Sequence, residues 1–256
     1  MILAVDIGNT TISFAIVKRK SIKQLHSVKT SQKAAVLSRE LTALLTKIKR
    51  KYPSMEAVVV CSVVPSASQT IAAATKKVFH SAPLFIGKDI KVPIKNLYQN
   101  PSQVGQDRLV CAYAARELYG APAIVVDFGT AITFDVISKK GEYQGGAIAP
   151  GLRLFAESLF EKTALLPQVT IKHPKGVIGC DTESSILSGI FYGYSSLCEG
   201  MISRISRKLD VKPVIVATGG HSGLIRRHLG RIDHFDQILI FRGLHLIYQK
   251  SLGLNK

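Results

Sequence analysis

Two segments of the sequence follow the same pattern, about half a chain apart. AVDIGNTTISFAIV covers residues 4–17, and VVDFGTAITFDVI covers residues 125–137. Each reads as an apolar strand, an aspartate (Asp6 or Asp127), one apolar residue, a glycine, hydroxyl-bearing residues and a second apolar strand. This order is typical of a β-hairpin. The repeat therefore predicts two similar α/β halves, each beginning with the same hairpin.

The segments around the hairpins alternate between helical and strand patterns. Apolar residues recur at helical spacing over residues 33–49, 67–79, 106–119, 151–170 and 183–209, and the 151–170 segment becomes loop-like before Pro167. Apolar runs predict buried strands at 57–64, 83–87 and 213–220. The tail from Asp236 reads as a last strand that turns into a helix. Residues 91–108 are rich in Pro, Asn and Gln and predict a loop.

Composition limits the classes of protein to consider. The chain has 256 residues and is 46% hydrophobic, enough for one large domain or two of half that size. Its four cysteines are scattered and form no CxxC pair, which favours a reducing cytosol over a disulfide framework or zinc site. No signal peptide or long uncharged apolar run is visible. We therefore expect a cytoplasmic protein without a membrane contact.

The net charge of +17 raises nucleic acid or an anionic ligand as a partner. The basic clusters are short, as at Lys18-Arg19-Lys20, Lys47 to Lys51 and Arg226-Arg227, and no aromatic residues interleave with them. A stacking platform for bases would need such aromatics. The charge therefore favours a solvated surface over a specific nucleic-acid site.

The repeated hairpin turn has the chemistry of a phosphate site. A glycine lets the backbone approach a ligand closely, and Thr10, Thr11 and Thr130 add hydroxyl donors. Aspartates fit beside phosphate when Mg²⁺ is present, because Mg²⁺ takes one or two carboxylates and fills its other positions with phosphate oxygens and water. The alternative is that each turn only reverses the chain. Because the pattern occurs twice, we favour a metal–nucleotide held by Asp6 and Asp127.

A third glycine turn, ATGG at residues 217–220, follows a buried strand. Such a turn is a usual place for a nucleoside to lie against backbone, although a plain strand-to-helix turn fits as well. The chain has no GxxxxGK[ST] loop and no GxGxxG after a strand. A P-loop or dinucleotide-binding fold is therefore not expected.

The motifs taken together resemble type III pantothenate kinases, within the actin/sugar kinase/heat-shock ATPase superfamily. The resemblance rests on DIGNT (6–10), CSVVP (61–65), the Y-x-N-P-x-x-V-G-x-D-R pattern from Tyr98 to Arg108, DFGTAITFD (127–135), GGAIAPG (145–151), the IGxxT pattern (178–182) and ATGG (217–220). It implies two ribonuclease H-like or actin-like lobes, 1–118 and 119–256. Each would be a mixed β-sheet flanked by helices, with the active site in the cleft between them.

The resemblance also implies an activity and its residues. Such enzymes transfer the γ-phosphoryl group of ATP to pantothenate, the first step of coenzyme A biosynthesis, and work as homodimers. Asp107 would be the catalytic base, Asp6 the carboxylate on the Mg²⁺ side, and Asp127 the ligand of a monovalent cation, K⁺ or NH₄⁺. The implied ATP contacts are Asp6, Ile7, Gly8, Asn9, Thr10, Thr11, Ile12, Ser13, Thr130, Gly219 and Gly220. The implied pantothenate contacts are Tyr98, Gly105, Gln106, Asp107, Arg108 and Thr182.

Two residues depart from the family pattern. Gln106 stands where a small residue is usual, so its side chain would either crowd the pocket or point away. Cys180 stands where Lys or Arg is frequent, which removes a positive charge near the substrate. Two other functions stay open: a non-catalytic regulator whose basic surface binds nucleic acid, and another small-molecule kinase or phosphatase of the superfamily. Intact Asp6, Asp107, Arg108 and Asp127 argue against the first, and the segment from Tyr98 to Arg108 argues against the second.

Overall fold

The computed structural model describes residues 1–18, 21–30 and 33–253. Arg19 and Lys20 of the first basic cluster lie outside these ranges. The chain divides into two compact units. The first holds Met1–Ile94, Asn100–Ala114 and the chain from Ile238 onwards, and the second holds Lys95–Gln99 and Ala115–Gln237. A lobe boundary at residues 118–119 stays a prediction, because the compact units are not continuous in the sequence.

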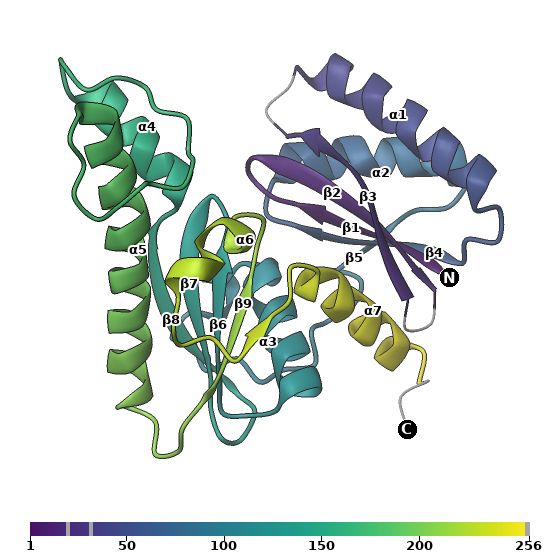
Figure 1. Ribbon diagram of the computed structural model, residues 1–256. Helices are drawn as coiled ribbons and strands as arrows, with labels where there is room; N and C mark the ends of the chain where they lie inside the picture. Colours follow the sequence, from purple (N-terminus) through teal and green to yellow (C-terminus); the bar gives the residue numbers. More distant parts are fainter. Residues whose placement is uncertain (19–20, 31–32, 254–256) are drawn as a thin grey trace. The chain divides into compact units, whose positions relative to one another are not determined.

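The first unit contains a five-stranded mixed sheet (Figure 1), in the order β3-β2-β1-β4-β5. β1 pairs with β2 in the antiparallel direction, as the first hairpin predicts, and with β4 in the parallel direction. The strands are β1 (Ile2–Ile7), β2 (Thr11–Lys18), β3 (Ser21–Lys29), β4 (Ala57–Ser62) and β5 (Leu84–Phe85).

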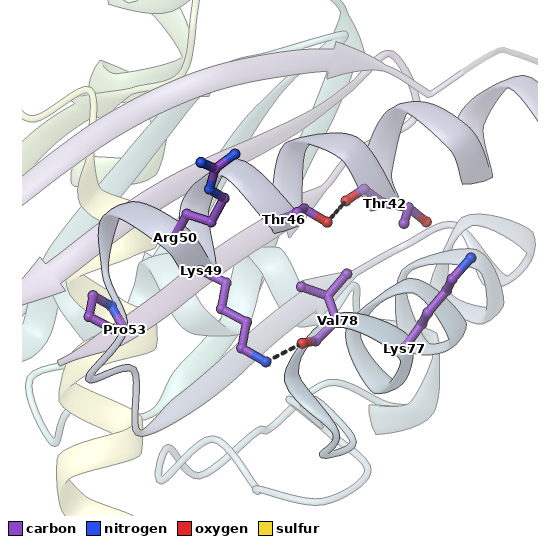
Figure 2. Close-up of a pocket in the computed structure, with 7 residues that line it drawn as sticks. All are labelled: Thr42, Thr46, Lys49, Arg50, Pro53, Lys77 and Val78. Atoms are coloured by element: carbon purple, nitrogen blue, oxygen red, sulfur yellow. Dashed lines mark hydrogen bonds between the residues drawn. The ribbon is translucent and has the colours of Figure 1, made fainter.

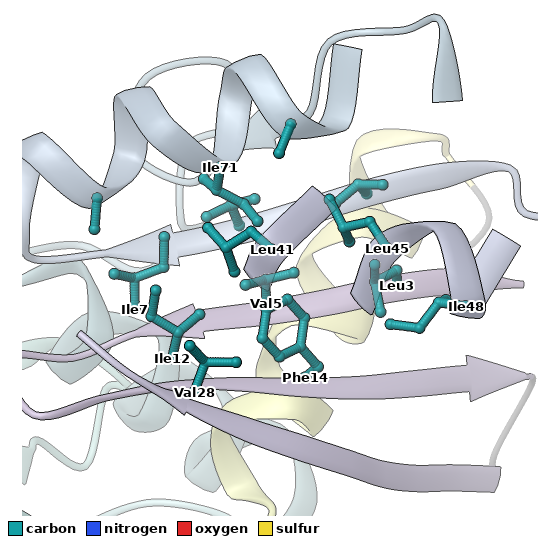
Figure 3. Packing of buried hydrophobic residues seen from close by; sticks show 14 of the residues in the cluster. Leu3, Val5, Ile7, Ile12, Phe14, Val28, Leu41, Leu45, Ile48 and Ile71 are labelled. Atoms are coloured by element: carbon teal, nitrogen blue, oxygen red, sulfur yellow. The ribbon is translucent and has the colours of Figure 1, made fainter. Parts of the chain in front are cut away.

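Helices cover both faces of this sheet, because successive strand residues point to opposite faces. Leu3 and Val5 of β1 pack with α1 (Ala34–Lys51) and α2 (Pro65–Phe79), and Figure 3 shows this core. Ala4 of β1 lies in the core of the other face, together with residues of α3 (Gln106–Tyr119) and α7 (Leu239–Ser251). Asp6 alternates with Ala4 along β1, so it belongs to the α3 face.

The second unit repeats the same topology. Its sheet has the order β10-β9-β6-β7-β8, with β6 antiparallel to β7 and parallel to β9. The strands are β6 (Ala123–Phe128), β7 (Ala131–Ile137), β8 (Tyr143–Pro150), β9 (Val214–Thr218) and β10 (His234–Phe235). The helices are α4 (Leu152–Lys162), α5 (Thr182–Ser206) and α6 (Ser222–Ile225), and a short 3₁₀ turn covers Arg226–His228, whereas the other 3₁₀ turn, Pro101–Gln103, lies in the first unit. The predicted α/β class with two similar mixed sheets is confirmed.

The sequence patterns do not predict two of the strands, for different reasons. β3 lies at a sheet edge, and most of its side chains are polar and at least partly exposed, so it shows no apolar run. β8 contains glycines, alanines and a terminal proline, which have weak strand preference. The strand predicted from Asp236 is wrong: the short β10 ends at Phe235, and the apolar residues that follow form α7.

The helices give no membrane-spanning segment. Within residues 1–18, 21–30 and 33–253, each helix is too short or too polar to span a bilayer.

Candidate active site

The first hairpin turn is fixed by hydrogen bonds from Thr30, and the tip of the turn is exposed. Gly8 N donates to Thr11 O at 3.0 Å, and Asn9 to Thr11 are exposed. Thr30, just after β3, donates from its hydroxyl to Gly8 O at 2.8 Å and from its amide to Thr10 O at 3.0 Å. The pattern search did not single out Thr30, because its partners are far away in the sequence. The turn is therefore fixed while its tip faces solvent.

The side chains of Ile7 and Ile12 do not face this tip. Both are fully buried in the core beneath α1 and α2. Of the predicted ATP contacts, these two therefore offer a ligand only their backbone atoms.

Asp6 lies beside a buried cysteine near a second carboxylate. Cys61 of β4 is the register partner of Asp6 and belongs to the core of the α3 face. Burial raises the pKa of the Cys61 thiol well above its ordinary value, and the negative charges of Asp6 and Asp107 raise it further. The fold therefore gathers Asp6, Cys61 and Asp107 in one unit. In the sequence Cys61 appears only as the first residue of the CSVVP motif, and nothing there marks it as a neighbour of Asp6.

Asp107 is held in the first turn of α3, which begins at Gln106. It therefore lies inside this helix rather than at its N-cap. The Arg108 amide donates to Asp107 Oδ1 at 2.9 Å. Burial raises the pKa of the Asp107 carboxyl above its ordinary value of 3.8, and the amide and charge of Arg108 lower it in part. The result is a positioned, half-buried carboxylate that accepts a proton more readily than an exposed aspartate.

The neighbours of Asp107 explain two motif residues. A Cβ on Gly105 would collide with Asp107 Oδ1, so the carboxylate occupies space that only glycine leaves open. A Cβ on Gly87 would lie 2.6 Å from Cδ of Gln106, so the Gln106 side chain packs against the Gly87 backbone. Gln106 is therefore accommodated by a glycine.

The second hairpin has a shorter turn with glycines around it. Gly129 N donates to Ala131 O at 3.1 Å, and Gly151 N donates to Thr130 O at 3.0 Å. A Cβ on Gly151 would lie 2.6 Å from Gly129 O, so no larger residue fits there. Gly151 was noticed only as part of the GGAIAPG motif, and its contact with the turn is a finding of the fold.

Asp127 and Gly219, both singled out in the sequence, are in contact. Gly219 has φ +91°, and a Cβ there would lie 2.7 Å from the Phe128 backbone and would collide with Asp127 Oδ1. Both the dihedral angle and the space therefore require glycine.

A pocket of about 330 Å³ begins where the ATGG segment ends. It is lined by Arg153, Ala156, Glu157, Gln168, Val169, Thr170, Ile171, His221 and Leu224. The His221 amide donates to Phe128 O at 3.0 Å, and its buried Nδ1 has no hydrogen-bond partner in the described part of the chain. A polar ligand atom at this pocket could satisfy it.

The remaining acceptor-side residues lie in the second unit. The ring of Tyr98 packs on Gly145 of β8. Thr182 is the first residue of α5, and the preceding Asp181 caps that helix by accepting from Ser184 N at 2.8 Å. Cys180 is exposed. Lys172 forms an ion pair at 2.8 Å with Glu183, the residue after Thr182. A basic side chain therefore lies near Thr182, although position 180 is a cysteine.

A larger pocket, of about 520 Å³, lies between α1 and α2 (Figure 2). It is lined by Thr42, Thr46, Lys49, Arg50, Pro53, Lys77 and Val78, and Lys49 Nζ donates to Val78 O at 2.6 Å. None of the predicted site residues lines it. Its cations belong to the basic ends of the two helices, so its size does not make it the candidate site.

The acidic residues fit a cation that is held mainly by the phosphate groups of a bound nucleotide. Among residues 1–18, 21–30 and 33–253, no group of three or more His, Cys, Asp or Glu could hold a metal ion. Mg²⁺ with a nucleotide needs only one or two carboxylates, because phosphate oxygens and water complete its shell. Asp6, with Asp107 near it, meets that requirement.

Comparison with known proteins gives a consistent result. Residues 2–204 match the family model for type III pantothenate kinase. The type III pantothenate kinase of Persephonella marina is 47% identical over 252 residues, which cover 97% of this chain and 98% of the relative. That of Halalkalibacterium halodurans is 39% identical over 254 residues, covering 98% and 100%.

Solved structures agree on the fold. A protein named as a Baf family transcriptional activator from Campylobacter jejuni has a TM-score of 0.57 at 19% identity, covering 99% of this chain and 100% of that one. A protein named as an N-acetylglucosamine kinase from Porphyromonas gingivalis has a TM-score of 0.51 at 16% identity, covering 98% and 100%. At such identities the likeness shows an actin/sugar-kinase-like fold and nothing of function.

Proposed function

Because the chain belongs to the type III pantothenate kinase family, we infer that it is a kinase that transfers a phosphoryl group to pantothenate in coenzyme A biosynthesis. The observation that carries this is the match over nearly the whole chain at 47% identity. A non-catalytic regulator on the same fold gains no support, since the likeness to a transcriptional activator is one of fold alone.

We propose ATP with Mg²⁺ as the phosphoryl donor. In the first unit, Asp6 would hold the cation side, and the exposed tip of the first hairpin would contact phosphate oxygens. In the second unit, Thr130 would contact phosphate, and Gly219 and Gly220 would lie against the nucleoside. The pocket beside His221 supports this, because it offers an apolar and polar lining next to that turn. When bound, the cation would neutralise charge on the triphosphate.

Asp127 would hold a monovalent cation, K⁺ or NH₄⁺. Its contact with Gly219 supports the proposal, because the carboxylate then lies at a turn where the backbone approaches closely. A cation there would supply positive charge in a hairpin that carries no lysine at its turn.

Asp107 would orient the pantothenate hydroxyl and accept its proton. A carboxylate is a weak base for an alcohol, because the pKa of an alcohol, like that of water, lies far above that of a carboxyl group. The transition state of phosphoryl transfer is loose, so the hydroxyl keeps its proton until late and orientation is the main contribution. Positioning of this kind is worth ~7–11 kcal/mol in favourable cases. The raised pKa of Asp107 makes the late proton transfer easier.

The other acceptor contacts divide by chemistry. Arg108 would bind the pantothenate carboxylate, which a guanidinium grips with two parallel hydrogen bonds. Gly105 would leave room beside Asp107, and Tyr98 and Thr182 would contact pantothenate from the second unit. Gln106 would contribute through its backbone, because its side chain packs on Gly87.

An assay with a matched control tests these roles. The protein is incubated with ATP, Mg²⁺ and pantothenate, in potassium or in sodium, beside Asp107→Asn and Asp89→Asn. Asp89 is an exposed carboxylate that accepts a backbone amide at 2.8 Å, much as Asp107 does at 2.9 Å. We expect product with potassium, little with sodium, almost none from Asp107→Asn and normal turnover from Asp89→Asn. Equal turnover by Asp107→Asn would remove its role, and no product under any condition would favour the regulator.

We also propose a homodimer that works in the cytoplasm. The second unit exposes large apolar side chains, with Leu165 91% and Ile178 86% exposed, and such side chains are frequent where a partner covers a surface. Sedimentation of the purified protein tests the dimer, and a single species of monomer mass contradicts it.

A further inference from the structure

A short segment that precedes α3 pairs with the edge of the second sheet. Leu97 N donates to Tyr143 O at 2.8 Å, and Tyr143 N donates to Lys95 O at 2.9 Å. These two bonds form an isolated parallel bridge between Asn96 and Tyr143, the first residue of β8. Residues 95–99 therefore belong to the second unit, although the chain on both sides of them belongs to the first.

This pairing places Tyr98 on a glycine. The Tyr98 amide donates to Asn96 Oδ1 at 3.0 Å, which fixes the backbone after the bridge. A Cβ on Gly145 would lie 3.3 Å and 3.4 Å from Cδ2 and Cε2 of the Tyr98 ring. Gly145 also has φ +118°, where side chains are strained. The ring thus lies flush on a backbone position that only glycine leaves free.

The side chain of Tyr143 anchors the bridge in the interior. Its hydroxyl donates to Asp135 Oδ1 at 2.8 Å, and the Thr133 hydroxyl donates to Asp135 Oδ2 at 2.9 Å. Tyr143 is fully buried and Asp135 is 1% exposed. A buried carboxylate must keep its donors, because an unsatisfied one is costly. Tyr143 therefore cannot rotate without breaking this network.

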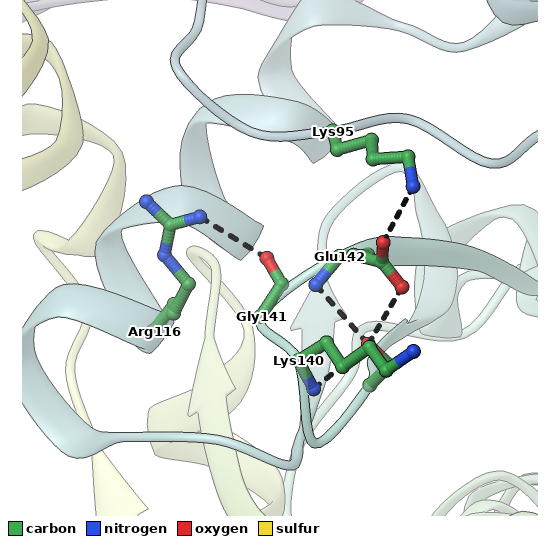
Figure 4. Close-up of polar contacts among 6 residues, drawn as sticks. Lys95, Arg116, Lys140, Gly141 and Glu142 are labelled. Atoms are coloured by element: carbon green, nitrogen blue, oxygen red, sulfur yellow. Dashed lines mark hydrogen bonds and ion pairs between the residues drawn. The ribbon is translucent and has the colours of Figure 1, made fainter.

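An ion pair closes the bridge on the outside (Figure 4). Lys95 Nζ lies 2.8 Å from Glu142 Oε1, and the hydrogen bond from Lys95 holds the pKa of the Glu142 carboxyl below its ordinary value. Arg116 donates to Gly141 O at 3.1 Å in the same turn. Because Lys95 is exposed, the ion pair contributes little to the stability of the bridge. The buried hydrogen bond between Tyr143 and Asp135 contributes more.

We propose that Tyr143 and Gly145 are positioning residues for the acceptor side: together they hold the Tyr98 ring where pantothenate meets it. Tyr143 acts through its backbone bridge and its bond to Asp135, and Gly145 acts as the bare surface under the ring. The proposal rests on the proposed function, in which Tyr98 contacts pantothenate.

A double-mutant cycle tests the role of Gly145. We expect Gly145→Ala to raise the KM for pantothenate about tenfold and to leave the KM for ATP within about twofold, a size common for directly coupled residues. In a Tyr98→Ala background the same change should no longer affect the KM for pantothenate, because no ring remains to displace. Gly120→Ala is the control: Gly120 has φ +95° with nothing within 4 Å, so it shares the backbone strain without the ring.

The Tyr143 bond is tested by Tyr143→Phe beside Tyr119→Phe. Tyr119 also donates to an aspartate, Asp236, at 2.9 Å, in the same unit but away from residues 95–99. We expect Tyr143→Phe to raise the KM for pantothenate and to speed hydrogen exchange of the Leu97 amide severalfold, and Tyr119→Phe to do neither. Both substitutions lose a similar bond, so a purely structural effect would appear in both.

The outcomes separate this proposal from the proposed function. If the wild-type protein makes no phosphorylated pantothenate, the function fails. If it does, but Gly145→Ala raises the KM for pantothenate equally with and without Tyr98, the positioning role is overturned and the function stands. An unchanged KM in Tyr98→Ala, or unchanged Leu97 exchange in Tyr143→Phe, also overturns it.

Discussion

The two acidic hairpins share a topology but differ in what surrounds each aspartate. In register, Asp6 faces Ser13 and Asp127 faces Thr133, and each turn glycine donates to a backbone carbonyl across the turn. The first turn is one residue longer, since Ile7 pairs with Ile12 whereas Phe128 pairs with Ile132. Asp6 lies next to a thiol and near a second carboxylate, whereas Asp127 lies against the backbone of Gly219.

This difference supports the two roles that we propose for the repeated motif. A pair of nearby carboxylates is suited to a divalent cation and a hydroxyl that must be oriented. Under our proposal, the Asp127 carboxylate beside the Gly219 backbone would take the cation of lower charge. The shared topology sets the position of each aspartate, and its neighbours set the chemistry.

The largest expected effect comes from exchanging each aspartate for its amide. We expect Asp6→Asn and Asp127→Asn each to lower kcat/KM for ATP about a hundredfold or more, because an electrostatic partner of the transferring phosphoryl group is lost. Only Asp127→Asn should also lose the preference for potassium over sodium. Steady-state kinetics in both salts separate the two, and loss of the potassium preference in Asp6→Asn instead would reverse our assignment.

The next largest effect is expected from replacing Gly219, the glycine that contacts Asp127. Gly219→Ala would place a strained residue against Asp127 and Phe128, and we expect it to cost about 1–3 kcal/mol of the free energy of unfolding. Gly220→Ala, with nothing within 4 Å of its Cβ position, should cost much less. Urea unfolding of both variants measures the difference, and equal values would show that the contact is unimportant.

A smaller effect is expected from replacing Thr30, which fixes the first hairpin turn. Thr30→Val removes the hydroxyl that donates to Gly8 O, and we expect a loss of about 0.5–1.5 kcal/mol of stability, typical of one hydrogen bond. Thr30→Ser keeps the donor and should restore most of it. If the serine variant is as unstable as the valine variant, packing rather than the hydrogen bond holds the turn.

The smallest effect is on the pH dependence of stability. Burial raises the folded-state pKa of Asp107 above 3.8. The stability that protonated Asp107 gives the folded state is therefore fully present below pH 3.8 and is lost as pH rises through the raised pKa. Ionised Asp107 therefore destabilises the folded state at neutral pH, and Asp107→Asn should unfold at a slightly higher temperature there, with no gain below pH 3.8. Thermal unfolding across pH checks this, and a gain at acid pH alone would contradict it.

Much of the fold follows from patterns in the sequence. Both hairpins, the helices α1, α2, α3 and α5, and the buried strands β4 and β9 are confirmed within a few residues. They are long or strongly periodic, so local preference and burial agree. β3 and β8 escape because their stability comes from pairing with β2 and β7 rather than from their own side chains.

The candidate site divides in the same way. The residue types of DIGNT and DFGT point to phosphate and a cation, the resemblance gives Asp107 of G-x-D-R its role at the hydroxyl, and the family match agrees for the activity. Thr30 and Tyr143 were not singled out, and Cys61 and Gly151 appeared only inside the CSVVP and GGAIAPG motifs, since each has a partner distant in the sequence.

The sequence by itself determined the duplicated α/β architecture and the kind of chemistry, because periodicity, turn glycines and motif order are local properties of the chain. Only the tertiary structure decided which groups meet: Asp107 near Asp6, Gly219 on Asp127, and residues 95–99 along β8. Such meetings depend on how strands pair and helices cover a sheet, and no local preference encodes a partner that lies tens of residues away.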